Sequence, residues 1–191
     1  MRPNFWNNRY ASGDTPWVLG GIPQALDAFL RRTKPGAVLI PGCGNDQNAI
    51  RAFVEAGFVT TAIDFSPAAV AQAAASLGKL GDRLLVADFF QHEFGVSRFD
   101  MIYERTFLCA LPRSLREQYA GRVAELLRPG GVLGGFFFYG EEDPEGPPFP
   151  LPREKANTLF VKKFRLRHSE KVTDSIQLFT GREEWQEWER V

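Results

Sequence analysis

A glycine turn between two apolar runs is the feature that most constrains the fold of this chain. The run at 37–40 enters a turn with Gly42 and Gly44, and a second run at 59–63 ends at Asp64. The glycines lack a Cβ, so the turn can adopt positive φ and a ligand can approach its backbone. Asp64 follows Gly44 by 20 residues, where an acid can bind both hydroxyls of a ribose. The segment predicts a strand, turn, helix and strand that bind an adenosine-bearing cofactor.

Dinucleotides and S-adenosylmethionine both use this arrangement, and the residues after the turn distinguish them. A pyrophosphate needs an open helix amino end, which the third glycine of G-x-G-x-x-G helps to form. That position is Gln47 here, and Asp46 adds a negative charge nearby. Such a charge suits the cationic methionine end of S-adenosylmethionine. We therefore predict the methyl donor as cofactor, with NAD as the weaker alternative.

Length and composition restrict the class of protein. We expect residues 1–191 to form a single domain, because this length can bury a full core. Lys+Arg and Asp+Glu are both 23, so no basic field attracts nucleic acid. No stretch approaches the ~20 apolar residues of a membrane span. Cys43 and Cys109 form no spaced framework, which favours a reducing cytoplasm. We expect a monomer or weak dimer, a small-molecule acceptor and no metal.

Apolar runs alternate with helical patterns over the first two thirds of the chain. Continuous apolarity suits strands that are buried on both faces. The expected strands are 37–40, 59–63, 84–88, 99–103 and 132–138. The expected helices are 45–56, 67–77 and 114–127. This order predicts an α/β fold with a doubly wound, mostly parallel, Rossmann-like sheet.

The last third changes character. A Pro/Gly loop at 143–150 precedes two segments, 164–172 and 175–179, that read as strands separated by a polar turn. We expect these strands to form an antiparallel pair at the C-terminal edge of the sheet. The final segment, REEWQEWER, closes the chain.

Two further acids stand at expected strand ends. Asp88 ends the third strand and Glu104 the fourth, and ligands of open parallel sheets bind outside these ends. Asp88 could accept a hydrogen bond from an adenine amino group, and Phe89 could cover the ring. Arg105 has two interpretations: a partner for an acid such as Glu104 or Asp46, or a ligand of the cofactor carboxylate or an anionic substrate.

The chain resembles the thiopurine S-methyltransferase family of class I methyltransferases, particularly its halide/thiol methyltransferase branch. The resemblance runs nearly continuously over 5–149 and is carried, in order, by FWNNRY, GDTPWVLGG, VLIPGCGND, AIDFS, ADFF, FDMIYERTFLCALP, LLRPGG and EGPPF.

The resemblance implies roles for particular residues. Residues 1–30 would cover the cofactor and 139–163 would form a substrate-side insert, with Tyr139 and Phe149 in the pocket wall. The implied cofactor residues are Trp6, Tyr10, Trp17, Gly42, Asp64, Asp88, Phe89 and Arg105, and the residue pattern itself adds Gly44, Asp46 and Glu104. Arg105 and Tyr10 are the expected catalytic residues. Tyr10 stands where the family usually has Trp, and its aromatic face, like those of Trp6 and Trp17, would attract a sulfonium or simply anchor the segment.

The chemistry expected from these residues is in-line methyl transfer, in which positioning supplies much of the rate. An aromatic, dry pocket favours an anion that attacks a sulfonium, since charge is lost at the transition state. We therefore predict a small, soft acceptor: a thiol or thiopurine, a halide or pseudohalide, or a reduced chalcogen anion. Arg105 would help to keep a thiol ionised. A small-molecule O-methyltransferase and a non-catalytic S-adenosylmethionine-binding module are the alternatives.

Overall fold

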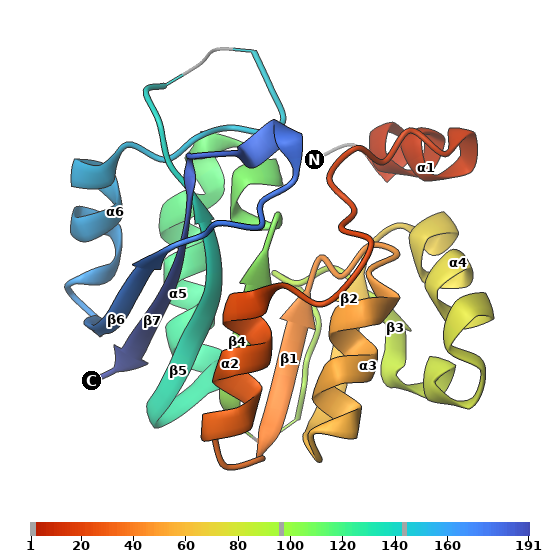
Figure 1. The fold of residues 1–191 in the computed structure, drawn as a ribbon, viewed down its shortest axis with the longest axis horizontal. Coiled ribbons are helices and arrows are strands. Elements are labelled where there is room, and N and C mark those ends of the chain that lie inside the picture. The colour runs from red at the N-terminus through yellow and green to blue at the C-terminus, as the bar shows by residue number, and fades with distance from the viewer. Residues whose placement is uncertain (1–2, 96–97, 143–144) are drawn as a thin grey trace. The chain divides into compact units, whose positions relative to one another are not determined.

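The structure, a computed structural model, describes residues 3–95, 98–142 and 145–191 (Figure 1). Contacts divide the chain into a first unit, Met1–Val96, and a second unit, Ser97–Val191. Part of the expected loop at 143–150, residues 143 and 144, lies outside the described residues. Each unit is built around its own set of strands.

The strands of the first unit are parallel and lie in the order β3-β2-β1. They are β1 (Ala37–Pro41), β2 (Val59–Asp64) and β3 (Leu84–Val86). The first two confirm the predicted strands. The third is shorter than the predicted 84–88, because Asp88 accepts a hydrogen bond from the amide of Phe90 and begins a turn.

Two helices of the first unit begin at side-chain caps. The helices of this unit are α1 (Pro3–Ser12), α2 (Gln24–Arg32), α3 (Gln47–Glu55) and α4 (Pro67–Leu77). The side chain of Asp46 accepts from the amide of Ala49 at the start of α3. Ser66 does the same for Ala69 at the start of α4. Such caps satisfy amides that have no partner within the helix.

The second unit combines parallel and antiparallel strands in the order β4-β5-β7-β6 (Figure 1). Strands β4 (Phe99–Arg105) and β5 (Leu127–Phe138) are parallel, whereas β7 (Glu183–Arg190) is antiparallel to β5 and to β6 (Phe164–Lys171). The longer helices are α5 (Arg116–Leu126) and α6 (Arg153–Phe160). The predicted helix 114–127 starts slightly later, after the 3-10 turn Arg113–Leu115.

The predicted antiparallel pair exists, but one of its strands was assigned wrongly. Residues 175–179 do not form a strand, since Gln177–Phe179 is a 3-10 helix. The partner of β6 is β7, which also pairs with β5 and is therefore an inner strand. A hydrophobicity pattern does not indicate β7, because several of its buried side chains are polar. Glu187, for example, is buried and accepts a hydrogen bond from the indole of Trp185.

Gly135 allows β4 and β5 to approach closely. A Cβ built at Gly135 would lie 1.9 Å from the carbonyl oxygen of Glu104, its register partner on β4. Real Cβ atoms do not approach a backbone oxygen so closely, so this position accepts only glycine without a backbone shift. The contact fixes the end of β4 against β5.

Candidate active site

The glycine turn of the first unit is bonded directly to the acid at the end of β2. The amide of Gly44 donates to Asp64 Oδ2 at 2.9 Å, and the amide of Ser66 donates to Oδ1 at 2.8 Å. Asp64 is 5% exposed, and burial raises its pKa while the amide donors oppose that rise. A carboxylate has about four acceptor positions, so these two contacts leave capacity for ligand hydroxyls.

Three aromatic side chains of the N-terminal segment gather at this turn. Trp17 packs edge-on against Trp6, with ring centroids 5.4 Å apart, and against Tyr10, at 5.9 Å. Gly44 has φ +54°, and a Cβ on it would lie 2.3 Å from the hydroxyl oxygen of Tyr10. The missing Cβ therefore makes the space that the Tyr10 hydroxyl occupies. Burial, and then the charge of Asp64, raises the pKa of Tyr10, so the phenol stays protonated.

Helix α1 is held to α4 by side-chain hydrogen bonds. Ser66 donates to the side-chain oxygen of Asn7, and Gln72 Nε2 donates to the carbonyl oxygen of Tyr10 at 2.8 Å. These contacts join residues about 60 positions apart and keep the aromatic residues of the first helix beside the turn. The tie to α4 could not be read from the sequence, because nothing in the motif FWNNRY, which contains Asn7, or around Gln72 indicates that the two segments meet.

The other predicted cofactor residues of the first unit have different surroundings. Gly42 has φ +57° in the turn, and Asp46 serves as the cap of α3. Asp88 is exposed and its Oδ1 accepts from the amide of Phe90 at 2.8 Å, whereas Phe89 is buried. Among the described residues, no group of His, Cys, Asp or Glu could hold a metal ion.

Glu104 is the most deeply buried acid among the described residues of the second unit. Its Oε1 accepts from the amides of Phe107 and Leu108 at 2.9 and 2.8 Å, and Oε2 accepts from the Tyr119 hydroxyl at 2.6 Å. Burial raises the pKa of Glu104 to about 7 against these donors. The carboxyl group thus fixes the turn after β4, a function that the sequence analysis did not assign to it.

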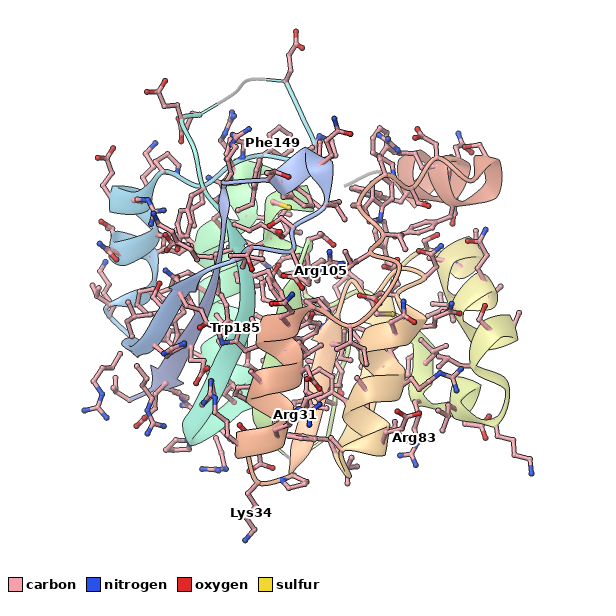
Figure 2. The ribbon with its side chains drawn as sticks, viewed as in Figure 1. Arg31, Lys34, Arg83, Arg105, Phe149 and Trp185 are labelled. Atoms are coloured by element: carbon pink, nitrogen blue, oxygen red, sulfur yellow. The ribbon has the colours of Figure 1, made fainter. Side chains whose placement is uncertain are left out.

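Arg105 lies at the end of β4 and is 9% exposed (Figure 2). Its guanidinium carbon lies 5.8 Å from the ring centroid of Phe136, the register partner of Arg105 on β5. Arg105 interacts electrostatically with Glu183. Burial raises the pKa of Glu183, and the charge of Arg105 opposes part of that rise. An acid interaction for Arg105 was anticipated, but Glu183 was not a candidate because β7 was not recognised.

A small pocket lies in the second unit, beside Glu104. Its walls are Leu108, Cys109, Leu151 and the rings of Phe136, Phe137, Phe138 and Phe149. Phe149 lies on the segment that leads to α6 (Figure 2), and its amide donates to the carbonyl oxygen of Cys109 at 2.7 Å. The phenylalanine-rich end of β5 therefore contributes rings both to the core and to this pocket.

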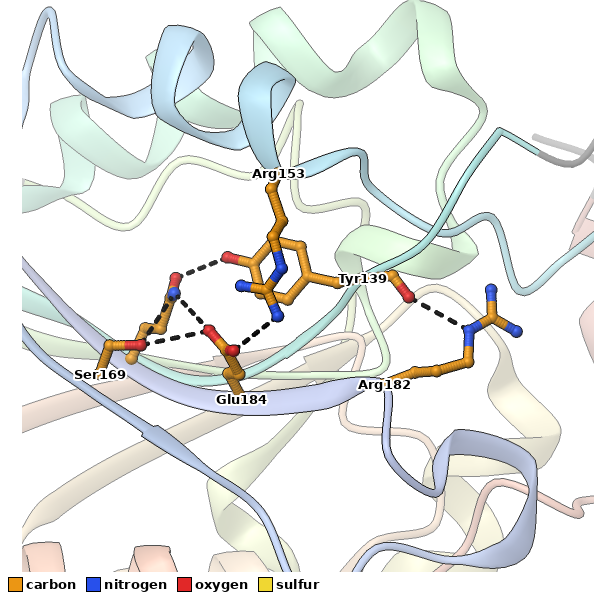
Figure 3. Close-up of polar contacts among 6 residues, drawn as sticks. Tyr139, Arg153, Ser169, Arg182 and Glu184 are labelled. Atoms are coloured by element: carbon orange, nitrogen blue, oxygen red, sulfur yellow. Dashed lines mark hydrogen bonds and ion pairs between the residues drawn. The ribbon is translucent and has the colours of Figure 1, made fainter.

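Tyr139 is not among the residues that line this pocket. Its hydroxyl donates to Gln186 Oε1 at 2.7 Å, and its ring lies under the guanidinium of Arg153, 4.5 Å from the centroid (Figure 3). Arg153 also bonds Glu184 at 2.6 Å. The arrangement anchors α6 to β7, so Tyr139 has a structural partner set of its own.

Both cysteines are buried thiols. Burial, and then nearby carboxylates, raises the pKa of Cys43 and of Cys109 well above the usual range. A thiol held in the protonated form is a poor nucleophile. Both cysteines therefore act as small packing residues in the core.

Two solved structures with this fold are methyltransferases. The chain superposes on a Burkholderia thailandensis 1,6-didemethyltoxoflavin N1-methyltransferase, solved with S-adenosylhomocysteine, with a TM-score of 0.78, 19% identity, and coverage of 99% of this chain and 87% of that one. It also superposes on a Synechocystis magnesium protoporphyrin IX methyltransferase, likewise solved with S-adenosylhomocysteine. Here the TM-score is 0.74 and the identity 14%, and the match covers 99% of this chain and 99% of that one. The fold is therefore the class I methyltransferase fold, with its mostly parallel sheet and helices on both sides.

Sequence comparison identifies the family. The profile of the thiopurine S-methyltransferase family matches residues 1–190. A Vibrio campbellii thiopurine S-methyltransferase is 32% identical over 82% of this chain and 80% of its own length. A probable thiol methyltransferase of Arabidopsis thaliana is 32% identical over 82% of this chain and 71% of its own length. The chain belongs to the thiopurine S-methyltransferase family and is an S-adenosylmethionine-dependent methyltransferase.

The first unit suits this cofactor. It offers a turn that only a residue without a Cβ can form beside Tyr10, a buried carboxylate with acceptor capacity, and aromatic faces for a cation.

No helix among residues 3–95, 98–142 and 145–191 is long and apolar enough to cross a membrane.

Proposed function

We propose that the protein methylates a small, soft nucleophile, with thiols as the first candidates and halides, pseudohalides and reduced chalcogen anions as others. The observation that carries this proposal is the pocket of Phe136, Phe138 and Phe149 beside Arg105. It offers apolar, polarisable walls, which suit sulfur better than a hydrated oxygen nucleophile. The name of the Arabidopsis thaliana relative points to the same chemistry.

We assign cofactor binding chiefly to the first unit. Asp64 would bind the ribose hydroxyls, Gly42 and Gly44 would admit the cofactor to the backbone, and Trp6, Tyr10 and Trp17 would cover it. Asp46, Asp88 and Phe89 are further candidates. When bound, S-adenosylmethionine supplies a methyl group attached to a positively charged sulfur.

The residues around the pocket would act by positioning and by excluding water. Arg105 would stabilise the thiolate form of the acceptor, since a guanidinium stays charged in a buried site. Tyr10, which keeps its proton, would act as a hydrogen-bond donor or ring surface and not as a base. Glu104 would hold the turn that carries Leu108 and Cys109 in the pocket wall.

Calorimetric titration with S-adenosylhomocysteine, followed by turnover with a thiol panel, iodide and bisulfide, tests the proposal. Binding together with a methylated thiol is expected. Binding with methylation of only phenols would support the O-methyltransferase alternative, and binding without any product would support a non-catalytic module. Phe149→Ala should change acceptor kinetics and leave cofactor affinity normal; unchanged acceptor kinetics would remove Phe149 from the pocket.

We further propose that residues 1–191 work as one methyltransferase domain in the cytoplasm, as a monomer or weak dimer that does not bind nucleic acid. The balanced charge and the buried, unpaired thiols of Cys43 and Cys109 support this setting. Light scattering in reducing buffer would test the oligomeric state, and a stable tetramer would contradict it.

A further inference from the structure

Strand β6 is the last strand of its sheet. It pairs with β7 along one edge, and among the described residues no strand lies beside its other edge (Figure 1). Such an edge carries backbone amides and carbonyls that a further strand can bind. The side chains along β6 that are exposed to solvent are those of Arg165, Leu166, Arg167, Ser169, Glu170 and Lys171.

An irregularity in β6 brings the side chains of Arg165 and Glu170 to the same face of the sheet. Residues five apart on a regular strand point to opposite faces. Here the register with β7 shifts between the two, so that Arg165 lies opposite Glu189 and Glu170 lies opposite Trp185. Glu189 and Trp185 are four positions apart on β7, which pairs regularly with β5, and therefore share a face. Directly opposite residues point the same way, so Arg165 and Glu170 share that face as well.

The two ends of this face carry opposite charge. Glu189 Oε1 lies 3.3 Å from Arg165 Nη2 and its Oε2 lies 2.8 Å from Arg167 Nη1, so one carboxylate serves two guanidinium groups. At the other end Glu170 Oε2 lies 3.5 Å from His168 Nε2, a side chain that is charged only when protonated. The face is thus positive at Arg165 and negative at Glu170. An antiparallel copy of the same strand sets each end against its opposite.

We propose that β6 pairs antiparallel with β6 of a second copy of the chain, in the register that sets Arg165 opposite Glu170 of that copy. Two-fold symmetry makes this ion pair occur twice, and the same register sets Leu166, which is 42% exposed, opposite Ser169. Cross-strand pairs of opposite charge stabilise antiparallel strands. One strand pair is a small interface, so the dimer is weak and reversible. The inference goes beyond the proposed methyl transfer and supplies the interface of a weak dimer.

Charge swaps test this register. Sedimentation velocity over a concentration series at low salt should show a reversible dimer of the wild-type protein. Arg165→Glu and Glu170→Arg each set like charges opposite one another at two places, which should weaken dimerisation at least about tenfold. The double variant Arg165→Glu/Glu170→Arg restores both pairs and should recover the dimer affinity to within about threefold of wild type. Within one chain the two positions are roughly 15 Å apart, so only pairing between copies explains such a recovery.

A matched control separates the strand pairing from net charge. Lys34→Glu makes the same change of net charge as Arg165→Glu at an exposed site of the first unit (Figure 2), and it should leave dimerisation unchanged. A double variant as weak as the single swaps would overturn the inference, as would a dimer that neither swap weakens. A wild-type protein that stays monomeric would also overturn it, because the charges of β6 would then only protect its edge. Methylation of thiols by such a monomer would keep the proposed function.

Cysteine trapping is a second measurement that does not depend on ion pairs. Directly opposite residues of an antiparallel pair lie about 5 Å apart, within the range of a disulfide. Leu166→Cys/Ser169→Cys should therefore give a covalent dimer under mild oxidation, while the native thiols of Cys43 and Cys109 stay buried. Leu166→Cys/Lys171→Cys moves the second thiol two residues along the same face and should give much less. Equal yields, or no covalent dimer from the first variant, would reject the register.

Discussion

The hydroxyl of Tyr119 donates a 2.6 Å hydrogen bond to the carboxylate of Glu104, and both side chains are buried at the end of β4. Backbone amides of Phe107 and Leu108 occupy the other oxygen. Burial nevertheless dominates and raises the pKa of Glu104 to about 7. The pocket wall therefore depends on an acid that titrates near neutral pH.

Stability should consequently decrease as the pH rises. The pKa of Glu104 is higher in the folded state, about 7, than its ordinary value of 4.5, so the folded state binds more protons between these values. Its contribution is complete below the unfolded pKa and is lost as the pH rises through the folded pKa. We expect the free energy of unfolding in urea to fall by about 2–3 kcal/mol between about pH 5 and pH 8.

Glu104→Gln is the control for this pH dependence. The amide oxygen can still accept from Phe107 and Leu108, while the titrating group is removed. In this variant the free energy of unfolding should fall much less steeply with pH. The fall should not vanish, because burial also raises the pKa of Glu183 and of Asp64. A slope as steep as that of wild type would show that Glu104 does not titrate in this range.

Gly44→Ala should combine backbone strain with a collision. Gly44 has φ +54° and the new Cβ would meet the Tyr10 hydroxyl at 2.3 Å, whereas Gly13 has φ +73° with nothing within 4 Å. Gly13→Ala should therefore lower the free energy of unfolding only by the cost of the left-handed conformation, about 1–2 kcal/mol. Gly44→Ala should lower it by more and should also bind S-adenosylhomocysteine less tightly. Tyr10→Phe removes the colliding oxygen, so the stability loss of Gly44→Ala beyond that of Gly13→Ala should shrink in the Tyr10→Phe background. If this additional loss persists there, it does not come from the collision.

The parts of the fold that were predictable have patterns dictated by burial. Strand β1 is a continuous apolar run and β2 is a run of apolar residues and threonines, and both matched the prediction. Strand β7 was missed because it buries Glu183, Gln186 and Glu187, polar residues that a hydrophobicity pattern reads as surface. Local hydrogen bonds from the indoles of Trp188 and Trp185 satisfy the side chains of Gln186 and Glu187. Tertiary pairing on both edges of β7, invisible in the sequence, decides its structure.

The candidate site divides in the same way. The position of Asp64 beside Gly44 follows from strand register, so spacing along the chain could predict it. The interaction of Arg105 with Glu183 joins segments far apart in sequence through β7, and no local signal could predict it. Long-range packing therefore fixes the charge balance of the pocket, whereas local pattern fixes the glycine turn.

Gly135→Ala should be among the most damaging single-methyl changes in the second unit. The new Cβ would lie 1.9 Å from the Glu104 carbonyl oxygen, so β4 and β5 must separate. We expect a loss of about 3 kcal/mol or more in the free energy of unfolding. At Gly134 the nearest atom is the flexible end of Met101, at 3.0 Å, so Gly134→Ala should stay within about 1 kcal/mol of wild type. Equal effects would contradict this view of the strand contact.

Gln72→Leu tests whether the tie between α4 and α1 controls the cofactor cover. The variant removes the 2.8 Å bond from Gln72 Nε2 to the Tyr10 carbonyl oxygen, worth about 1 kcal/mol. The first helix should open about fivefold more often, which would raise the rate of limited proteolysis in the mostly exposed segment 11–22 and weaken S-adenosylhomocysteine binding by a similar factor. Ser76→Ala changes the same helix at an exposed site and should alter neither. Proteolysis and affinity that both match wild type in Gln72→Leu would mean that the packing of Trp6, Tyr10 and Trp17 holds the helix without the tie.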